Sequence, residues 1–458
     1  MSKIRVPARV KPLGGILSEY GYRCFLVGGA VRNIARGEKP KDYDLATDAP
    51  PEEVMRMFHR TVPTGIKHGT VTVIFKGEQY EVTTLRVEGR YSDSRRPDSV
   101  SYTTDIVEDL SRRDFTVNGM AVDVASGEFI DPFDGMHDLQ AGLIRAIGQP
   151  RDRFVEDGLR ILRAVRFAGQ LGFEIEPATR AGITASLETL SSVSQERVRD
   201  ELVKLLEIKK PSRGLRMLDE TGILDLVLPE VARCREIGQD IGKPKDVLTH
   251  SILSVDGAPE GRLDIRLAAL LHDIGKAETV ISDQAGHTAF YGHERVSAER
   301  AAEILKRLRF PGAVIKHVCH LIKHHMFAYN SQWSDAAVRR FISRVGADSV
   351  GDLLLLRRAD TYGKSGHAVA DHSLVELETR VGGVLHHASA LSISDLAVDG
   401  RILHERADIP QNRDMGVVLE FLLESVLQDP QMNEIETLVG LARNFYKERI
   451  TGPRNNMS

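Results

Sequence analysis

Two aspartates separated by one residue, Asp42 and Asp44, are the first residues whose spacing could do chemistry. Alternation around them predicts a strand over residues 42–46, and side chains two residues apart on a strand point to the same face. Two carboxylates on one face repel each other unless a cation joins them. Mg²⁺ takes oxygen ligands and keeps substrate phosphates in its shell, and two such ions would activate an attacking hydroxyl and steady a leaving pyrophosphate. A solvated strand edge is the alternative explanation of this pair.

A pair of glycines precedes these aspartates. Gly28 and Gly29 follow a short apolar run, residues 24–27, and a helical stretch comes next at residues 30–35. Bare N–H groups at a helix N-terminus bind phosphate, and Arg32 in the first turn would grip phosphate oxygens with two donors. A tight turn alone would also explain two glycines. Their place just before the aspartates predicts a phosphate cradle beside a metal site.

A third carboxylate, Glu81, belongs to a predicted hairpin. Two β-rich runs, residues 70–75 and 80–85, are joined by a short polar segment that contains glycine, which is a hairpin signal. A carboxylate on a strand next to the aspartates would complete the metal site. Taken in isolation, Glu81 would be an ordinary exposed strand residue.

The elements that must position these residues change in type along the chain. Residues 1–140 carry mixed strand and helix signals, with Asp48 placed to cap a helix after Pro50-Pro51 and a polar loop over residues 90–108. Beyond them helical periodicity dominates. It is clearest over residues 159–171, 196–206 and 211–226. The predicted fold class is therefore α+β, with a small mixed α/β head followed by a long all-α part.

The composition fits an ordinary globular chain of about three domains. Its 458 residues are 42% hydrophobic and carry a net charge of −4, which argues mildly against a nucleic-acid binder unless an acidic site masks basic patches. The three cysteines form no CxxC pair, which argues against disulfides and favours a reducing compartment. Because we find neither a signal-peptide core nor a membrane-length apolar run, we expect a cytoplasmic protein without a membrane segment.

Several motifs, in order, resemble those of the class II tRNA nucleotidyltransferases, the family of CCA-adding enzymes and bacterial poly(A) polymerases. They lie within residues 20–205 and read FLVGGAVRN, DYDLAT, GIKHGTVTV, YEVTTLR, RRDFTVNGMA and EDGLRILRAVRFAGQLGF. Independent motifs in register are far more specific than any one of them. The resemblance implies a polymerase beta-like nucleotidyltransferase head followed by an elongated helical neck, body and tail. The expected ranges are 1–140 for the head, 141–240 for the neck, 241–370 for an HD domain and 371–458 for a tRNA-binding tail.

The resemblance assigns a role to each motif residue. Asp42 and Asp44 would hold two Mg²⁺ ions, and Glu81 would help to activate the primer hydroxyl. The other residues would contact the incoming nucleotide. Gly28, Gly29 and Arg32 would bind the triphosphate, His68 would lie near the nucleotide, Arg112, Arg113, Asp114 and Asn118 would sense the ribose, and Arg163 and Arg166 would support the template or the triphosphate. In the ribose set, a 2′-OH would donate to Asp114.

The same resemblance makes Asp157 and Arg160 a template built of protein. At positions i and i+3 they would share one face of a helix. The aspartate would accept from an exocyclic amine and the arginine would donate to a ring nitrogen and a carbonyl oxygen, so that the pair would select C and A over G and U. An ordinary i,i+3 salt bridge is the alternative. A later segment, residues 194–204, would brace the template helix without doing chemistry.

The middle of the chain resembles an HD phosphohydrolase domain. His250, His272-Asp273 within LLHDIGK, and Asp360 reproduce its H…HD…D order. Imidazole together with carboxylate suits a transition metal. The domain would be either an active phosphohydrolase or an inherited helical scaffold.

Further histidines follow the HD segment. His293, His324 and His325 would be additional metal ligands. His317, His320 and His324 recur on one helical face. We interpret that face as a polar surface turned toward RNA.

These resemblances imply an enzyme that adds C, C and A to the 3′ end of tRNA from CTP and ATP without a nucleic-acid template. The alternatives within the family are CC-adding, A-adding and poly(A)-polymerase relatives. Those outside it are an HD phosphohydrolase as the main activity and an RNA-binding scaffold without catalysis. Residues 88–98 resemble the complete flexible loop of CCA-adding members, which favours full CCA addition. In the tail, a helix N-terminus near Met415 would contact tRNA phosphate or simply pack in the fold.

Overall fold

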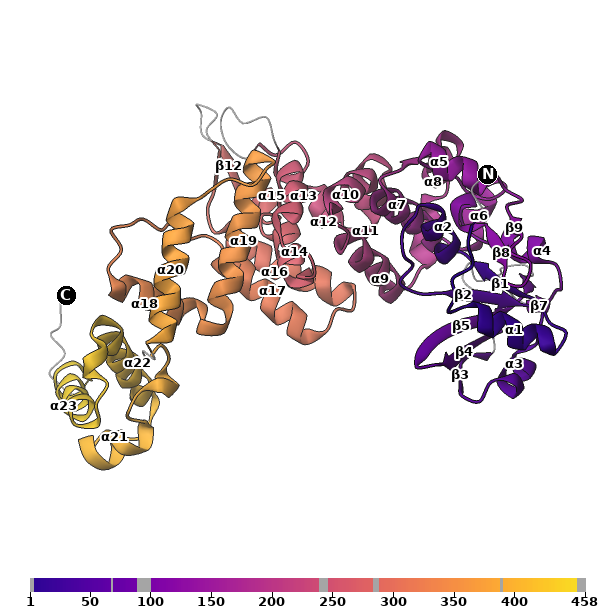
Figure 1. Ribbon diagram of the computed structural model, residues 1–458. Helices are drawn as coiled ribbons and strands as arrows, with labels where there is room; N and C mark the ends of the chain where they lie inside the picture. The colour runs from indigo at the N-terminus through magenta and orange to yellow at the C-terminus, as the bar shows by residue number, and fades with distance from the viewer. Residues whose placement is uncertain are drawn as a thin grey trace. The chain divides into compact units, whose positions relative to one another are not determined.

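The computed structural model describes residues 4–66, 69–88, 100–238, 246–282, 288–387 and 390–450. The chain forms two compact units. The first comprises residues 1–235 and 303–312, and the second comprises residues 236–302 and 313–458. The predicted head and most of the predicted neck, up to residue 235, fall in the first unit, and the HD residues and the tail fall in the second (Figure 1).

The head is built on a seven-stranded mixed sheet in the order β3-β4-β5-β2-β1-β8-β9. β2 and β5 run parallel, and the other neighbouring pairs are antiparallel. The strands are β1 (Cys24–Val27), β2 (Asp44–Thr47), β3 (Thr61–Gly65), β4 (Thr70–Phe75), β5 (Glu78–Thr84), β8 (Ala121–Asp123) and β9 (Phe129–Ile130). The predicted hairpin is confirmed as β4–β5, which turns at Lys76 and Gly77, both with positive φ.

β1 places the glycine pair and the carboxylates close together. Its sequence CFLV is apolar throughout and fully buried, because the strand has a paired neighbour on either side. The chain leaves β1 at Gly28 and enters α2 (Gly29–Ala35), as predicted. It returns in β2, whose first residue, Asp44, lies opposite Glu81 of β5.

Two local predictions around β2 are wrong. The strand begins at Asp44 and Asp42 precedes it in a bend, so strand alternation does not explain why Asp42 lies near Asp44. Asp48 does not cap α3 (Pro51–Met57). Its carboxylate instead accepts hydrogen bonds from the backbone N–H and the Nε of Arg23, at 2.8 and 3.0 Å, because the chain places Arg23 beside it at the start of β1.

The polar stretch over residues 90–108 is not a loop throughout. β7 (Val100–Tyr102) pairs with β6 (Arg86–Glu88), and α4 (Ile106–Ser111) follows with Asp105 as its N-cap. Residues 89–99 lie outside the described ranges.

Helices form the neck of the first unit. They are α6 (Pro150–Glu156), α7 (Leu159–Leu171), α8 (Pro177–Ala185), α9 (Gln195–Leu206), α10 (Pro211–Glu220), α11 (Ile223–Val227) and α12 (Pro229–Ala232). α7 packs against both α9 and α10 and buries most of its side chains. The helices predicted over residues 159–171 and 196–206 are confirmed. The range 211–226 holds two helices, because Gly222 takes a φ of 78° between them.

From residue 247 onward the chain is mainly helical. The longer helices are α13 (Val247–Gly257), α14 (Leu263–Leu271), α16 (His293–Arg307), α17 (Gly312–His324), α18 (Asp335–Val345), α19 (Ala347–Ser365), α20 (His372–His386), α21 (Gly400–Ala407), α22 (Arg413–Gln428) and α23 (Ile435–Phe445). α13 lies along α19 at Gly363, where a Cβ would approach Ser254 Oγ to 2.1 Å. A mixed head followed by helical domains confirms the α+β fold class. Within the described ranges, no helix has the length and apolar character needed to cross a membrane.

Candidate active site and metal centre

Three carboxylates gather where β2 begins beside β5. Asp44 is half-buried and pairs in register with Glu81, whereas Glu81 and Asp42 are exposed. Burial, and after it the negative charge of Glu81, raises the pKa of Asp44; Asp42 adds to the rise and Arg113 opposes it. A shared divalent cation would remove this repulsion, so the set of oxygen donors fits such an ion.

Gly28 forms the floor beside these carboxylates. Its φ of 65° lies in the left-handed region, which glycine adopts without steric cost. A Cβ at this position would lie 2.9 Å from Arg113 Nη1 and 3.8 Å from Asp44 Oδ2. The glycine therefore lets a guanidinium and a carboxylate approach the backbone from one side.

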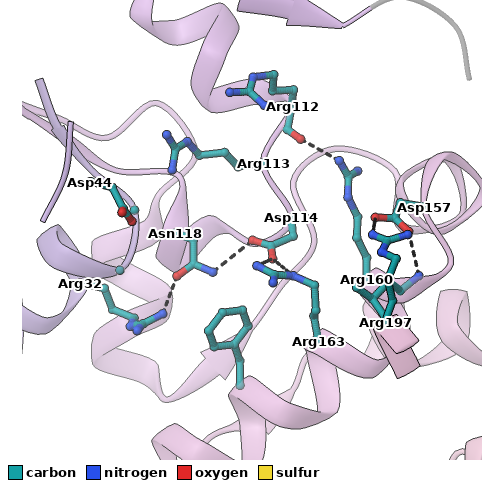
Figure 2. A pocket seen from close by; sticks show the side chains of 14 residues that line it. Arg32, Asp44, Arg112, Arg113, Asp114, Asn118, Asp157, Arg160, Arg163 and Arg197 are labelled. Atoms are coloured by element: carbon teal, nitrogen blue, oxygen red, sulfur yellow. Dashed lines mark hydrogen bonds and ion pairs between the residues drawn. The ribbon is translucent and has the colours of Figure 1, made fainter. Parts of the chain in front are cut away.

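A cavity of about 410 Å³ connects this floor to the neck helices (Figure 2). Six arginines and three aspartates line it, which makes the cavity positive overall. The lining residues are Gly28, Gly29, Arg32, Asp44, Arg112, Arg113, Asp114, Asn118, Asp157, Leu159, Arg160, Arg163, Phe167 and Arg197. All of them except Leu159, Phe167 and Arg197 are residues singled out from the sequence.

Asp114 stands at the centre of a hydrogen-bonded chain across the cavity. Arg32 Nη1 donates to Asn118 Oδ1 at 2.6 Å, and Asn118 Nδ2 donates to Asp114 Oδ1 at 3.1 Å. Arg163 Nε and Nη2 lie 2.8 and 2.7 Å from the other oxygen of Asp114. Burial alone would raise the pKa of Asp114, but Arg163 and Asn118 outweigh it and lower the pKa to about 2.

The hydrogen bonds of Asp114 affect its expected contact with the ribose 2′-OH. The N–H of Phe115 also donates to Asp114 Oδ1, at 2.9 Å. With the bonds from Asn118 and Arg163, all four acceptor positions of the carboxylate are filled. Acceptance from a ribose 2′-OH would require one of these hydrogen bonds to be exchanged. In the described arrangement Asp114 instead orients Asn118 and Arg163.

Arg112 and Arg113 share an anchor that the sequence analysis missed, Asp109. Its carboxylate is 1% exposed and lies 2.7 Å from Arg112 Nη2 and 3.3 Å from Arg113 Nη2. The i,i+3 and i,i+4 spacing is the signal that could have found it. Arg113 Nε is buried and has no hydrogen-bond partner among the described residues.

Asp157 and Arg160 line the cavity but do not share one helix. Asp157 ends α6 in an extended conformation, and Arg160 lies in the first turn of α7. The prediction that both stand on a single helical face is therefore wrong. The alternative, a salt bridge between them, is wrong as well. Asp157 pairs with Arg197 at 2.7 Å (Figure 2). Arg160 pairs with Glu156, also at 2.7 Å.

Arg166 lies behind the cavity and does not line it. It is 7% exposed and its Nε lies 2.5 Å from Glu201 of α9. The guanidinium also packs 3.9 Å from the centre of the Phe167 ring. The contact with Glu201 agrees with the expectation that residues 194–204 brace α7. His68 lies outside the described residues.

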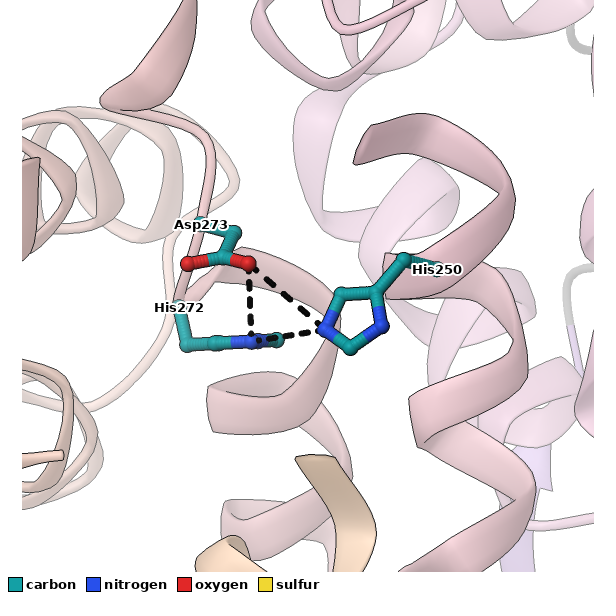
Figure 3. A group of neighbouring side chains, drawn as sticks. All are labelled: His250, His272 and Asp273. Carbon is teal, nitrogen blue, oxygen red and sulfur yellow. Dashed lines mark hydrogen bonds and ion pairs between the residues drawn. The ribbon is translucent and has the colours of Figure 1, made fainter. Parts of the chain in front are cut away.

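The HD residues converge from separate helices. His250 comes from α13, His272 and Asp273 follow α14, and Asp360 lies in α19. His250 Nε2 lies 3.2 Å from His272 Nε2, which in turn lies 3.2 Å from Asp273 Oδ2 (Figure 3). Asp360 Oδ1 lies 3.1 Å from His250 Nε2. All four residues are at most 5% exposed.

Two more histidines face the other oxygen of Asp273. His293 Nε2 and His325 Nε2 lie 3.3 and 3.7 Å from Asp273 Oδ1. In three of the cluster's imidazoles, Nδ1 lies within hydrogen-bonding distance of a backbone carbonyl, at 2.9 Å for His272, 2.8 Å for His293 and 2.7 Å for His325. Such bonds turn Nε2 toward the cluster, the usual arrangement of metal-binding histidine. The donor set therefore fits a transition metal.

Positive side chains of the same unit touch the carboxylates of this cluster. Lys276 Nζ lies 2.7 Å from Asp273 Oδ2, and Lys364 Nζ lies 2.8 Å from Asp360 Oδ2. Each lysine therefore neutralises part of the charge that would otherwise attract a cation.

The histidines of α17, which we interpreted from the sequence as a polar surface turned toward RNA, are half-buried, and two of them are paired within their own unit. His317 Nε2 lies 2.9 Å from Asp352, and His320 Nε2 lies 2.6 Å from the carbonyl of Val345. The ring of His324 lies against His320 and belongs to neither ligand group described above. Burial, and after it His320, lowers the pKa of His324 to about 4. Packing of α17 against its own unit explains these contacts.

Comparison with protein families divides the chain into three matched parts. Residues 24–145 match the "Poly A polymerase head domain", residues 172–234 match the family described as "Probable RNA and SrmB- binding site of polymerase A", and residues 232–362 match the "HD domain". The chain also resembles a solved structure of the Bacillus stearothermophilus CCA-adding enzyme in complex with CTP. Identity is 26%, the TM-score is 0.73, and 96% of this chain and 98% of that chain are covered. The fold is shared with a Thermotoga maritima CCA-adding enzyme complexed with tRNA, at 22% identity and a TM-score of 0.57 over 96% and 97% of the two chains.

Curated relatives carry the same name. A CCA-adding enzyme of Lactobacillus johnsonii is 47% identical over 46% of this chain, and the match spans 53% of the relative, about half its length. A CCA-adding enzyme of Bacillus velezensis is 38% identical over 67% of this chain and 69% of the relative. The chain therefore belongs to the family of the CCA-adding enzymes, the class II tRNA nucleotidyltransferases with a poly(A) polymerase head.

Proposed function

We propose that this chain is a CCA tRNA nucleotidyltransferase, which adds C, C and A to the 3′ end of tRNA from CTP and ATP. The observation that carries the proposal is that Asp44, Asp157 and Arg160 line one cavity. Asp44 could hold a metal ion at the triphosphate while Asp157 and Arg160 contact the base of the same nucleotide. The CTP and tRNA complexes of the similar structures support this choice of substrates.

In the proposed reaction the 3′ oxygen of the primer attacks the α-phosphorus, and the bond from phosphorus to the bridging oxygen of pyrophosphate breaks. Two Mg²⁺ ions held by Asp42 and Asp44 would neutralise charge on the attacking and leaving oxygens. Glu81, exposed beside Asp44, would take the proton of the primer hydroxyl. Arg32 and Arg113 would bind the triphosphate, since both line the cavity, Arg32 near Gly29 and Arg113 near Gly28.

Base selection would follow from the donor and acceptor pattern of the cavity. The carboxylate of Asp157 accepts from the exocyclic amine that C and A share, whereas G and U present a carbonyl oxygen there. Arg160 donates to the neighbouring acceptors of the base. A carbonyl facing a carboxylate would leave both groups unpaired, which is costly in a partly buried site.

Nucleotide omission tests this function. A tRNA that lacks CCA is offered CTP alone, ATP alone or both, and the products are resolved by length. A CCA-adding enzyme adds C residues with CTP alone and completes CCA only with both nucleotides. Addition of A alone to a CC-ended tRNA, arrest after CC, or a long run of A would identify the partial-activity relatives instead. Asp44→Ala should abolish addition while tRNA binding persists.

A second candidate activity is metal-dependent hydrolysis of a phosphoester in the HD cluster. The observation that favours it is the orientation of the His272, His293 and His325 imidazoles by backbone carbonyls. A bound transition metal would polarise a phosphoryl oxygen and activate water. Hydrolysis that disappears in His272→Ala and persists in Asp42→Ala would support this activity. A purified protein that binds no transition metal and hydrolyses nothing would favour the scaffold instead.

A further inference from the structure

The two base-reading candidates carry opposite charges and lie three residues apart, yet they do not pair. Side chains at this spacing can meet, and a carboxylate that meets a guanidinium would satisfy it and lose its own acceptors. Arg160 is instead held by Glu156, whose Oε2 lies 2.7 Å from Nη1, and by the carbonyl of Arg112, 2.9 Å from Nη2. Asp157 is held by Arg197 (Figure 2).

The contact between Arg197 and Asp157 fixes the carboxylate in its plane. Arg197 comes from α9, and its Nη1 and Nη2 lie 3.1 and 2.7 Å from Oδ1 and Oδ2. The backbone N–H of Leu159 donates to Oδ1 at 3.0 Å. A carboxylate offers about four acceptor positions. Among the residues that the structure describes, three are filled, so that one position on Oδ2 remains for a ligand in the cavity.

We propose that Arg197 is a positioning residue that determines base specificity, because it keeps Asp157 apart from Arg160. This inference rests on the proposed function and deepens it. Without the two hydrogen bonds from Arg197, the Asp157 side chain would be free to rotate about its two single bonds. Arg160 and Arg163 line the same cavity, and pairing of the freed carboxylate with either guanidinium would remove the acceptor that reads the base.

The test compares Arg197→Gln with Arg197→Lys and with a matched control, Arg199→Gln. Arg199 lies on the same helix, but it pairs with Asp200 and the backbone of Arg309 and does not line the cavity. For each protein, kcat/KM is measured for CTP and for UTP on tRNA lacking CCA. The Kd of each nucleotide is measured separately without primer. Thermal unfolding of each variant verifies that it is folded.

We expect Arg197→Gln to reduce the preference for CTP over UTP by about tenfold or more, the loss of one charged hydrogen bond. Arg197→Lys should retain part of the preference, because lysine supplies the charge without the two-pronged geometry. Arg199→Gln should match the unsubstituted protein. An equal loss of kcat/KM for CTP and UTP in Arg197→Gln would overturn the role of Arg197 and leave the proposed function standing. Absence of any CTP preference in the unsubstituted protein would overturn the proposed function and this inference with it.

Discussion

In the head, two of the three clustered carboxylates, Asp42 and Glu81, are exposed, whereas Asp273 and Asp360 of the HD cluster are only 2% and 5% exposed. The positive charges differ as well. Arg32, Arg112 and Arg113 of the head line the cavity, while Lys276 and Lys364 lie directly on the HD carboxylates. The head is thus arranged to receive ions and a polyanion from solvent. A metal entering the HD cluster must instead compete with internal cations.

The sharpest test of this comparison separates the two sites by substitution. We expect Asp44→Asn to lower nucleotide addition by about a thousandfold, because it removes a carboxylate that neutralises charge at the reacting phosphate. Hydrolysis of phosphoesters should be unchanged. His272→Ala should show the opposite pattern. If either substitution reduced both activities to the same degree, the two sites would not be independent.

Metal addition probes the buried cluster directly. A transition metal at about a hundred times its Kd should stabilise the protein against unfolding by about 2.7 kcal/mol, since only the folded chain brings the ligands together. Manganese and nickel are suitable probes, with the transition followed by calorimetry. His272→Ala should abolish the gain, and His324→Ala, which alters a histidine outside both ligand groups, should preserve it. Equal stabilisation of the His272→Ala protein would place the metal elsewhere.

The contribution of Asp114 to the stability of the head should depend on pH. The folded pKa of Asp114 is depressed to about 2 from an ordinary value of 3.8. Its contribution to stability is therefore present above about pH 4 and is lost as the pH falls toward 2. Asp114→Asn should be less stable by about 2 kcal/mol at neutral pH, with the difference shrinking below pH 4. Urea unfolding between pH 3 and 7 measures this. A difference that stays constant with pH would contradict the ionic role.

The smallest expected effect on nucleotide addition is that of a substitution at Gly28. Gly28→Ala should raise the KM for CTP about tenfold, because the added methyl meets Arg113 Nη1 at 2.9 Å and the φ of 65° is strained for alanine. Gly37→Ala is the matched control, since Gly37 has a φ of 76° but no atom within 4 Å of its Cβ position. It should lower stability without changing KM. Similar KM values in both variants would remove the steric argument.

Much of the head is predictable because its signals are local. The apolar run before Gly28, the helix after it, and the hairpin that carries Glu81 each depend on residues adjacent in the chain. Two of the HD residues are predictable for the same reason. The local motif LLHDIGK identifies His272 and Asp273 without any knowledge of packing. The C-cap position of Asp157 was missed, because a helix boundary depends on a single residue's backbone conformation.

Local order thus accounts for which groups are available: carboxylates, a glycine turn and a set of histidines. The partners of those groups come from elsewhere in the chain. Arg197 follows Asp157 by forty residues, and His325 reaches Asp273 from just beyond the C-terminal end of α17. No periodicity encodes such a contact, because it forms only when separate helices pack and bring their side chains within a few ångströms. The physical reason is that charge pairing acts through space, whereas sequence patterns report neighbours within a turn or a strand.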